Sequence, residues 1–400
     1  MEADRYFPPA VRAALAYDPP GAWMPPLPSG CIRLSAGYPF KASVPSVELA
    51  RATAALVAAE ADLPFHYLGS PAMGRLPALL AARSVLRGMA AGPGELMVTA
   101  GAAQALDLAA RAVLGPADVV AVEAPTYMEA LEIFRNYTPL ILGYPVDGEG
   151  LQVAALASDL ADRRAKGLPT PKLLYTIASF QNPTGATLSL VRRRRLLELA
   201  REYDFLILED DAYGELAFGD VPTPIKALDT DGRVIYVGSL SKVIAPGLRI
   251  GWVHAAPGLV AAMSNFKKDL DQPFGQAVTA TYLASVDLSA RVDELRRAYR
   301  ERRDVMLAAL AQHMPAGVTW TRPEGGFFLW LHAPGVDTGA LLAQALAAGV
   351  AYVPGKHFYF GANVGGREFL RLSFCYLPEE QMIDGVARLG RLLAAPGSDR

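Results

Sequence analysis

The stretch Val237-Gly238-Ser239-Leu240-Ser241-Lys242 places two hydroxyl groups and a lysine directly after an apolar run, and Pro-Gly-Leu-Arg follows at residues 246–249. The apolar run at 234–237 lacks the alternation of a half-exposed strand, which is typical of a strand buried on both faces. Open α/β sheets bind ligands beyond the carboxyl ends of such strands. The hydroxyls and Arg249 suit a phosphate, and desolvation would lower the pKa of Lys242 toward that of an amine nucleophile. Taken alone, this segment is explained equally well by an ordinary lysine in a loop.

Four more short apolar runs repeat this pattern along the chain, at residues 119–122, 173–176, 205–208 and 250–253. Helical patterns such as residues 191–203 separate them, which indicates parallel strands joined by crossover helices. We therefore predict a large, mostly parallel, doubly wound α/β domain over residues 46–285. Helices over residues 47–61 and 75–89 are expected at its start.

The two ends of the chain differ from this middle part. Residues 1–45 are rich in proline and are expected to form an extended arm with little regular structure, belonging to a smaller domain. Residues 286–400 combine helical patterns at 292–313, 338–348 and 379–393 with strand-like runs at 327–332 and 370–374. This part is predicted to be a small α+β C-terminal domain.

Composition excludes several classes of protein. The chain has 400 residues, 52% hydrophobic and 20% charged, so it can bury a large core and is not disordered. A formal net charge of -2 offers no basic excess for nucleic acid, and no apolar run reaches the ~18 residues of a membrane span. Two distant cysteines and five scattered histidines lack metal-site spacing. The charged N-terminus is unlike a signal peptide, so a cytoplasmic protein is expected.

Three other segments place polar residues where predicted strands end. The Gly-Ala-Ala turn at 101–103 precedes a helical pattern, and a helix N-terminus offers free backbone N–H groups to an anion. The Asn-Pro-Thr-Gly sequence at 182–185 is turn chemistry. The Glu-Asp-Asp run at 209–211 caps a buried strand, where a carboxylate needs a cation or a donor. A helix cap or a metal-binding pair is the alternative for this acidic run.

Together these segments resemble the class I and II aminotransferases, which are pyridoxal-phosphate enzymes of fold type I. The motif order matches: a glycine turn, E-x-P-x-Y, N-P-T-G, D-x-x-Y, S-x-S-K, P-G-L-R and a late arginine in R-L-S-F. The likeness spans about residues 34–393 and is greatest to bacterial aminoadipate and aromatic-type aminotransferases and to the effector domains of MocR-type regulators. It implies the three-layer fold of pyridoxal-phosphate-dependent transferases. It also implies transfer of an amino group between an L-amino acid and a 2-oxo acid by ping-pong half-reactions.

The resemblance assigns Lys242, Asp210 and Tyr213 as catalytic residues around pyridoxal 5'-phosphate. Lys242 would form the Schiff base with the cofactor and move the proton of the substrate. Asp210 would pair with the pyridinium nitrogen, because the family spacing to Tyr213 favours it over Glu209 or Asp211. Asp211 is expected to point to the other face of the sheet.

The resemblance also implies how the rest of the cofactor is held. Tyr213 and Asn182 would form hydrogen bonds with the ring oxygen, and Tyr127 would stack on the ring. The residues implied at the phosphate are Gly101, Ala102, Ala103, Ser239, Ser241, Arg249 and, from a neighbouring subunit, Tyr67. Relatives often carry a hydroxyl where this chain has alanine after the glycine, a loss on the order of 1 kcal/mol in cofactor affinity. A Tyr67 shared between subunits implies a homodimer with shared active sites.

For the substrate, the resemblance implies that Arg371 clamps the α-carboxylate, because a planar guanidinium matches a carboxylate bidentately. Gly37 matches a family glycine near that carboxylate, and Tyr38 replaces the family's second glycine. The substrate is not identified by the sequence. Candidates for the side-chain pocket are Trp23, Tyr38, Phe274, Phe327 and Phe328, with Arg33 and Arg75 as possible partners of a distal carboxylate.

Two alternatives to transamination stay open at this point. The same residues support a cyclase, a β-elimination lyase or a decarboxylase, because a fold does not fix the reaction. The proline-rich arm favours an altered side-chain pocket and with it altered chemistry. The second alternative is a non-catalytic cofactor-binding sensor that regulates transcription. Such regulators need a winged-helix domain, and only about 30 proline-rich residues precede the catalytic pattern here.

Overall fold

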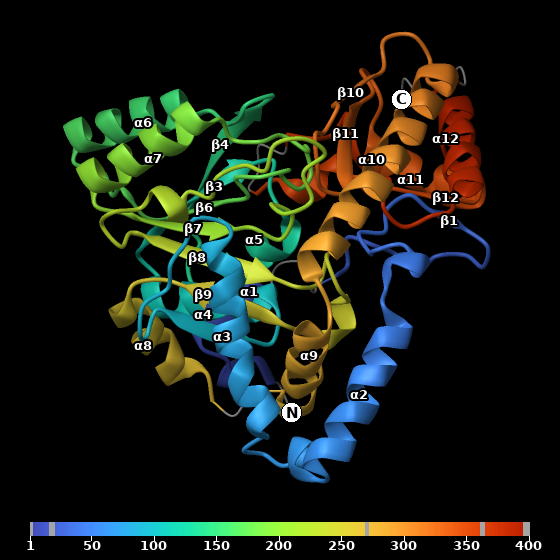
Figure 1. The fold of residues 1–400 in the computed structure, drawn as a ribbon. Helices are drawn as coiled ribbons and strands as arrows, with labels where there is room; N and C mark the ends of the chain where they lie inside the picture. Colours follow the sequence, from blue (N-terminus) through green and yellow to red (C-terminus); the bar gives the residue numbers. More distant parts are fainter. Residues whose placement is uncertain (1–2, 16–20, 269–271, 361–364, 395–400) are drawn as a thin grey trace.

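An eight-stranded sheet organises the larger part of the chain in a computed structural model that describes residues 3–15, 21–268, 272–360 and 365–394 (Figure 1). The strand order is β2-β9-β8-β7-β6-β3-β4-β5. Neighbours from β8 to β4 pair in parallel, whereas β9 runs antiparallel to β8 and β2, and β5 runs antiparallel to β4. The strands are β2 (Leu96–Thr99), β3 (Val119–Ala124), β4 (Ile141–Asp147), β5 (Gly150–Leu151), β6 (Pro171–Thr176), β7 (Leu206–Asp210), β8 (Val234–Ser239) and β9 (Gly251–His254). The mostly parallel sheet that was predicted is confirmed.

Helices cover both faces of this sheet and make the three-layer fold. Val120 and Val122 of β3 belong to the larger core, while Ala121 between them belongs to a second core under α6 and α7. This alternation is expected of a strand covered on both sides. The helices of this part are α2 (Ser46–Glu60), α3 (Pro71–Val85), α4 (Ala102–Val113), α5 (Met128–Phe134), α6 (Val153–Lys166), α7 (Leu190–Tyr203), α8 (Pro257–Phe266) and α9 (Pro273–Ser285).

A smaller antiparallel sheet carries the C-terminal part of the chain, with the order β10-β11-β14-β13 (Figure 1). Its strands are β10 (Thr319–Trp320), β11 (Phe328–His332), β13 (Val353–Pro354) and β14 (Phe369–Ser373). The helices α10 (Leu288–His313), α11 (Thr338–Ala347) and α12 (Glu379–Ala394) accompany it. In the arm, β1 (Ile32–Arg33) pairs in parallel with β12 (Val350–Ala351). The arm therefore contacts the smaller part, while domain boundaries near residues 45 and 285 stay predictions.

Three sequence-based expectations differ from the structure. The arm contains a short helix, α1 (Pro9–Leu15), because proline is well suited to the first helical position. Helix α10 begins at Leu288, before the expected residue 292, since the Asp287 side chain accepts hydrogen bonds from the Ser289 and Ala290 amides. Strand β9 is antiparallel, because residues 240–250 contain a 3-10 turn and no crossover helix.

Within the described ranges, no helix is long and apolar enough to cross a membrane. No group of three or more His, Cys, Asp and Glu side chains in those same ranges is placed to hold a metal ion. The cytoplasmic location expected from the sequence stays a prediction.

Candidate active site

A cavity of about 430 Å³ lies beyond the carboxyl ends of the central strands. Asp210 at the end of β7, Ser239 at the end of β8 and Ile177 just after β6 all line it. Arg371 of β14 and Trp23 of the arm complete its wall from the smaller part of the chain. The cavity is therefore at the place where open α/β sheets bind ligands.

Most of the residues predicted for the site line this cavity. They are Gly37, Tyr38, Ala102, Ala103, Tyr127, Asn182, Asp210, Tyr213, Ser239, Ser241, Lys242, Arg249 and Arg371. Gly101 is not a lining residue, but it directly precedes Ala102, and a Cβ on it would meet the guanidinium of Arg249. Tyr67 lies apart from the cavity, and 91% of its surface is exposed.

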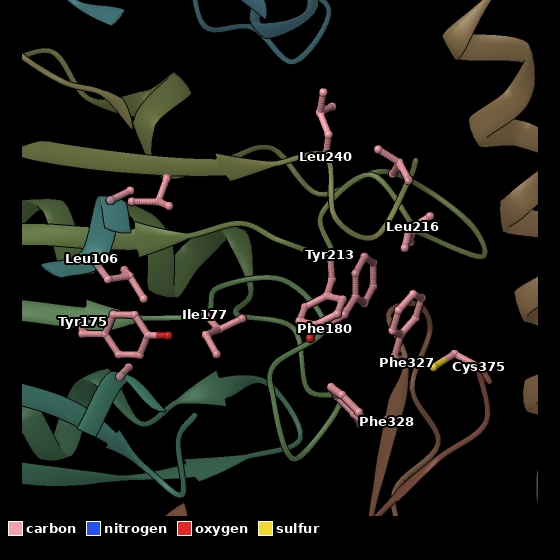
Figure 2. Packing of buried hydrophobic residues seen from close by; sticks show 14 of the residues in the cluster. Leu106, Tyr175, Ile177, Phe180, Tyr213, Leu216, Leu240, Phe327, Phe328 and Cys375 are labelled. Atoms are coloured by element: carbon pink, nitrogen blue, oxygen red, sulfur yellow. The ribbon is translucent and has the colours of Figure 1, made fainter. Parts of the chain in front are cut away.

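The side-chain pocket candidates divide into two groups. Trp23, Tyr38, Arg33 and Phe328 line the cavity. Phe327 is buried behind it and packs against Tyr213, as Figure 2 shows. The other two candidates lie away from the cavity. Phe274 stacks on Phe65 instead, and Arg75 is an exposed residue of α3.

Lys242 is held among aromatic rings and one backbone carbonyl. Its Nζ donates a hydrogen bond to the Gly37 carbonyl at 3.0 Å and lies 5.8 Å from the ring centres of Tyr213 and Phe327. Burial lowers the pKa of Lys242, because these surroundings solvate an ammonium poorly. A lysine with a lowered pKa supplies the neutral amine that nucleophilic and proton-transfer chemistry needs.

The three adjacent carboxylates at the end of β7 have three different environments. Asp210 lines the cavity, and its Oδ2 accepts a hydrogen bond from the Tyr175 hydroxyl at 2.9 Å. Asp211 accepts hydrogen bonds from Arg87 at 2.8 Å and from the Tyr236 hydroxyl at 2.9 Å. Glu209 accepts hydrogen bonds from the backbone amides of residues 225 and 226. Only Asp210 of the three faces the cavity, as alternation along the strand predicts.

Asp210 is a buried acceptor with one oxygen unused. Its Oδ1 has no hydrogen-bond partner among the residues that the structure describes, although the residue is only 5% exposed. Burial raises the pKa of Asp210 to about 6, while the Tyr175 hydroxyl acts in the opposite direction. A cationic N–H donor from a bound ring would satisfy Oδ1 and favour the ionised form. The free oxygen therefore fits a pyridinium nitrogen.

The turn before α4 forms an anion cradle with Arg249. Gly101 has φ of +87°, and a Cβ on it would lie 2.6 Å from Nη2 of Arg249. Helix α4 starts at Ala102, so its first N–H groups lack partners within the helix. The hydroxyls of Ser239 and Ser241 line the same cavity. Backbone donors, hydroxyls and a guanidinium together suit a phosphate group.

Arg371 is a buried guanidinium held by neutral groups. It donates hydrogen bonds to Oδ1 of Asn182 at 2.9 Å and to the Ser35 carbonyl at 3.0 Å, and it is 4% exposed. Among the described residues, no carboxylate forms an ion pair with it, and its Nε has no partner. Burial lowers the pKa of Arg371 to about 10, so it remains charged near neutral pH. A buried cation without a counter-ion is suited to binding a carboxylate from a ligand.

A buried network that the sequence did not reveal positions Asn182. Glu123 at the end of β3 accepts hydrogen bonds from the Thr176 hydroxyl at 2.6 Å and from Nε2 of Gln181 at 3.2 Å. Gln181 Nε2 also donates to the Pro125 carbonyl at 2.7 Å. These bonds join the end of β3 to the loop that carries Asn182. Glu123 in E-x-P-x-Y was the sequence signal, but its partners are more than 50 residues away.

Glu129 is a second residue that sequence reasoning missed. It lines the cavity from the first turn of α5, and the hydroxyl of Tyr127 donates a hydrogen bond to it. Its position two residues after Tyr127 was a signal in the sequence, because side chains in the first turn of a helix lie close to the residue that precedes it.

We expect Glu123→Gln to lower the free energy of unfolding by about 1–3 kcal/mol, because an amide NH2 would then face hydrogen-bond donors in a buried site. Urea denaturation followed by circular dichroism measures this. The exposed Glu301→Gln on α10 is the control and should leave the unfolding midpoint unchanged. Equal midpoints for the two variants would contradict the network.

Comparisons with known proteins agree with this geometry. The family model for aminotransferase class I and II matches residues 44–389. The aromatic-amino-acid aminotransferase 1 of Thermococcus litoralis is 44% identical over 75% of this chain and 72% of its own length. Transcriptional regulators of the helix-turn-helix type also match.

Several solved structures match nearly the whole chain, and the two described here each cover 98% of both chains. The multiple substrate aminotransferase of Thermococcus profundus has a TM-score of 0.89 and 37% identity. The alpha-aminoadipate aminotransferase of Thermus thermophilus, solved with N-(5'-phosphopyridoxyl)-L-leucine, has a TM-score of 0.86 and 35% identity. The family model covers most of the chain and the relatives match in sequence and fold. The chain therefore belongs to the class I and II aminotransferase family and is a transaminase.

Proposed function

We propose that this protein is a pyridoxal 5'-phosphate-dependent aminotransferase that exchanges an amino group between an L-amino acid and a 2-oxo acid. The observation that carries the proposal is the meeting of three groups in one cavity. These are Lys242 with its lowered pKa, Oδ1 of Asp210 and the guanidinium of Arg371. In the described part of the chain, that oxygen has no hydrogen-bond partner and the guanidinium has no counter-ion. They match an aldehyde, a ring nitrogen and a carboxylate respectively.

The chain offers a partner for each part of the cofactor. The turn at residues 101–103 with Ser239, Ser241 and Arg249 would hold the phosphate, and Asp210 would hold the ring nitrogen. Tyr213 and Asn182 would contact the ring oxygen, and Tyr127 the ring face. Pyridoxal phosphate bound there supplies an aldehyde and an electron-accepting ring. The phosphopyridoxyl-leucine in the related Thermus structure supports this assignment.

Different residues of the chain bind the substrate and transfer its proton. Arg371 binds the α-carboxylate, while Asn182 and Ser35 fix the plane of its guanidinium. Lys242 is held on the Gly37 carbonyl and, as a neutral amine, moves the proton from the α-carbon. The relatives described above are aminotransferases, which favours transamination over the cyclase, lyase and decarboxylase reactions.

We expect Lys242→Ala to slow conversion of an L-amino acid by about 100- to 10,000-fold, because the proton-transferring amine is lost. Stopped-flow absorbance of the cofactor measures the half-reaction, and circular dichroism checks the fold. Lys172→Ala is the control, since Lys172 is exposed and pairs with Asp118. A Lys242→Ala enzyme as fast as wild type would contradict the assignment.

Arg371→Lys should raise the KM for the amino acid by about 10- to 100-fold, with a smaller change in kcat, because one ammonium cannot form two parallel bonds to a carboxylate. Steady-state kinetics over a range of amino acid concentrations measures both constants. Arg367→Lys is the matched control, because Arg367 is exposed and pairs with Asp337. If KM were unchanged in Arg371→Lys, Arg371 would not bind the carboxylate.

We also propose a homodimer with shared active sites. Tyr67 and Leu68 are 91% and 96% exposed, and Phe65 beside them is 62% exposed, so one short segment presents three large apolar side chains to water. Such patches mark contact surfaces. We expect light scattering to give the mass of a dimer.

In that dimer, Tyr67→Phe should raise the Kd for pyridoxal phosphate by about threefold to tenfold, because one hydrogen bond to a charged group is lost. Equilibrium dialysis measures the Kd, and Tyr6→Phe, at another exposed tyrosine, is the control. A monomer, or an unchanged Kd in a dimer, would contradict the shared site.

A further inference from the structure

We infer that Glu129 selects the substrate side chain, favouring long side chains that end in a cation over those that end in a carboxylate. The inference rests on the proposed function, because it concerns the same cavity. Glu129 belongs to none of the motifs that carry the family resemblance, and it gives this cavity a negative charge of its own.

The substrate side chain must lie against the part of the cavity wall that neither the cofactor nor the α-carboxylate occupies. Arg371 takes the α-carboxylate, and the strand ends with the turn at 101–103 take the cofactor. One side of the remaining wall comes from the arm and from the start of α5. It is made up of Trp23, Met24, Arg33, Tyr38, Met128 and Glu129, and the uncharged Phe328 also lines the cavity.

The arm contacts α5, so their lining residues form one continuous surface. The amide of Gly21 donates a hydrogen bond to Glu132 of α5 at 3.4 Å. Trp23 and Met24 pack on the cluster that contains Met128. The long apolar side chains of this surface suit the methylene groups of an extended substrate.

Glu129 is the acidic group on this wall. It is half-buried, accepts a hydrogen bond from the Tyr127 hydroxyl, and has no ion pair with any described cation. Its charge acts within the cavity: burial lowers the pKa values of Lys242 and Arg371, and Glu129 is among the groups that oppose both shifts. A carboxylate that is partly removed from water and unpaired attracts a cation and repels another carboxylate.

Arg33 is the one competing charge among the residues that make up this wall. It is exposed, so water and salt screen its charge more than that of the half-buried Glu129. We therefore assign the preference to Glu129. A substrate with an acidic tail would instead have to be drawn to Arg33.

Three unreactive acids of equal chain length test the inference without turnover. Pentanoate, 5-aminopentanoate and glutarate share one carboxylate for Arg371 and differ in their far end. Each is titrated by calorimetry into the enzyme loaded with pyridoxamine phosphate, a form that cannot react with amines. We expect wild type to bind 5-aminopentanoate about tenfold more tightly than glutarate, with pentanoate between them.

In Glu129→Gln, this preference should fall to about threefold or less, while pentanoate binding is unchanged. Glutamine retains the hydrogen bond from Tyr127, so the fold of the wall is kept. Glu301→Gln, exposed on α10, is the matched control and should behave as wild type. Arg33→Gln removes the positive charge of this wall and keeps the negative charge of Glu129. It should leave the preference for 5-aminopentanoate in place.

Two results would overturn the inference: tighter binding of glutarate than of 5-aminopentanoate in wild type, or the same preference in Glu129→Gln. Failure of the proposed function gives a different result. In that case the protein would not take up pyridoxamine phosphate, or the loaded protein would convert no 2-oxo acid. Either result would contradict the proposed function and the inference together.

Discussion

The site depends on charged groups that the fold buries without giving them full partners. Within the described ranges, one carboxylate oxygen of Asp210 has no hydrogen-bond partner, and Arg371 is held by an amide and a carbonyl and not by a carboxylate. Such groups are costly in a protein interior unless a ligand satisfies them. The parallel strands make this arrangement possible, because their carboxyl ends bring residues far apart in sequence to one edge of the sheet.

The neighbouring buried charges are satisfied internally, and this contrast identifies the ligand-binding ones. Asp211 pairs with Arg87 at 2.8 Å, and Glu209 lies 3.7 Å from Arg193. These pairs tie the end of β7 to Arg193 of α7 and to Arg87 in the turn after α3. They hold the strand end in place and leave Asp210 as the carboxylate available to a ligand.

The sequence predicted those parts whose signals are local. The runs that became β7 and β8 were recognised as short, uninterrupted apolar stretches. Asp210 was preferred to Asp211 because of the family spacing to Tyr213 and because neighbouring side chains of a strand point to opposite faces. Strand β4 was missed, because Gly143 and Pro145 interrupt its apolar pattern. The Glu123 network joins residues more than 50 positions apart, and Glu129 faces the cavity only because of where α5 packs. These features depend on tertiary contacts, which no local pattern encodes.

Transamination by this protein is tested most directly by the absorption spectrum of the protein with pyridoxal phosphate, followed as single L-amino acids are added without any 2-oxo acid. We expect loss of the visible band of the lysine-bound cofactor, appearance of the amine form, and one equivalent of 2-oxo acid per site. Release of ammonia or carbon dioxide without conversion of the cofactor to its amine form would contradict it. The groups gathered around Lys242 would then serve another reaction of the same cofactor.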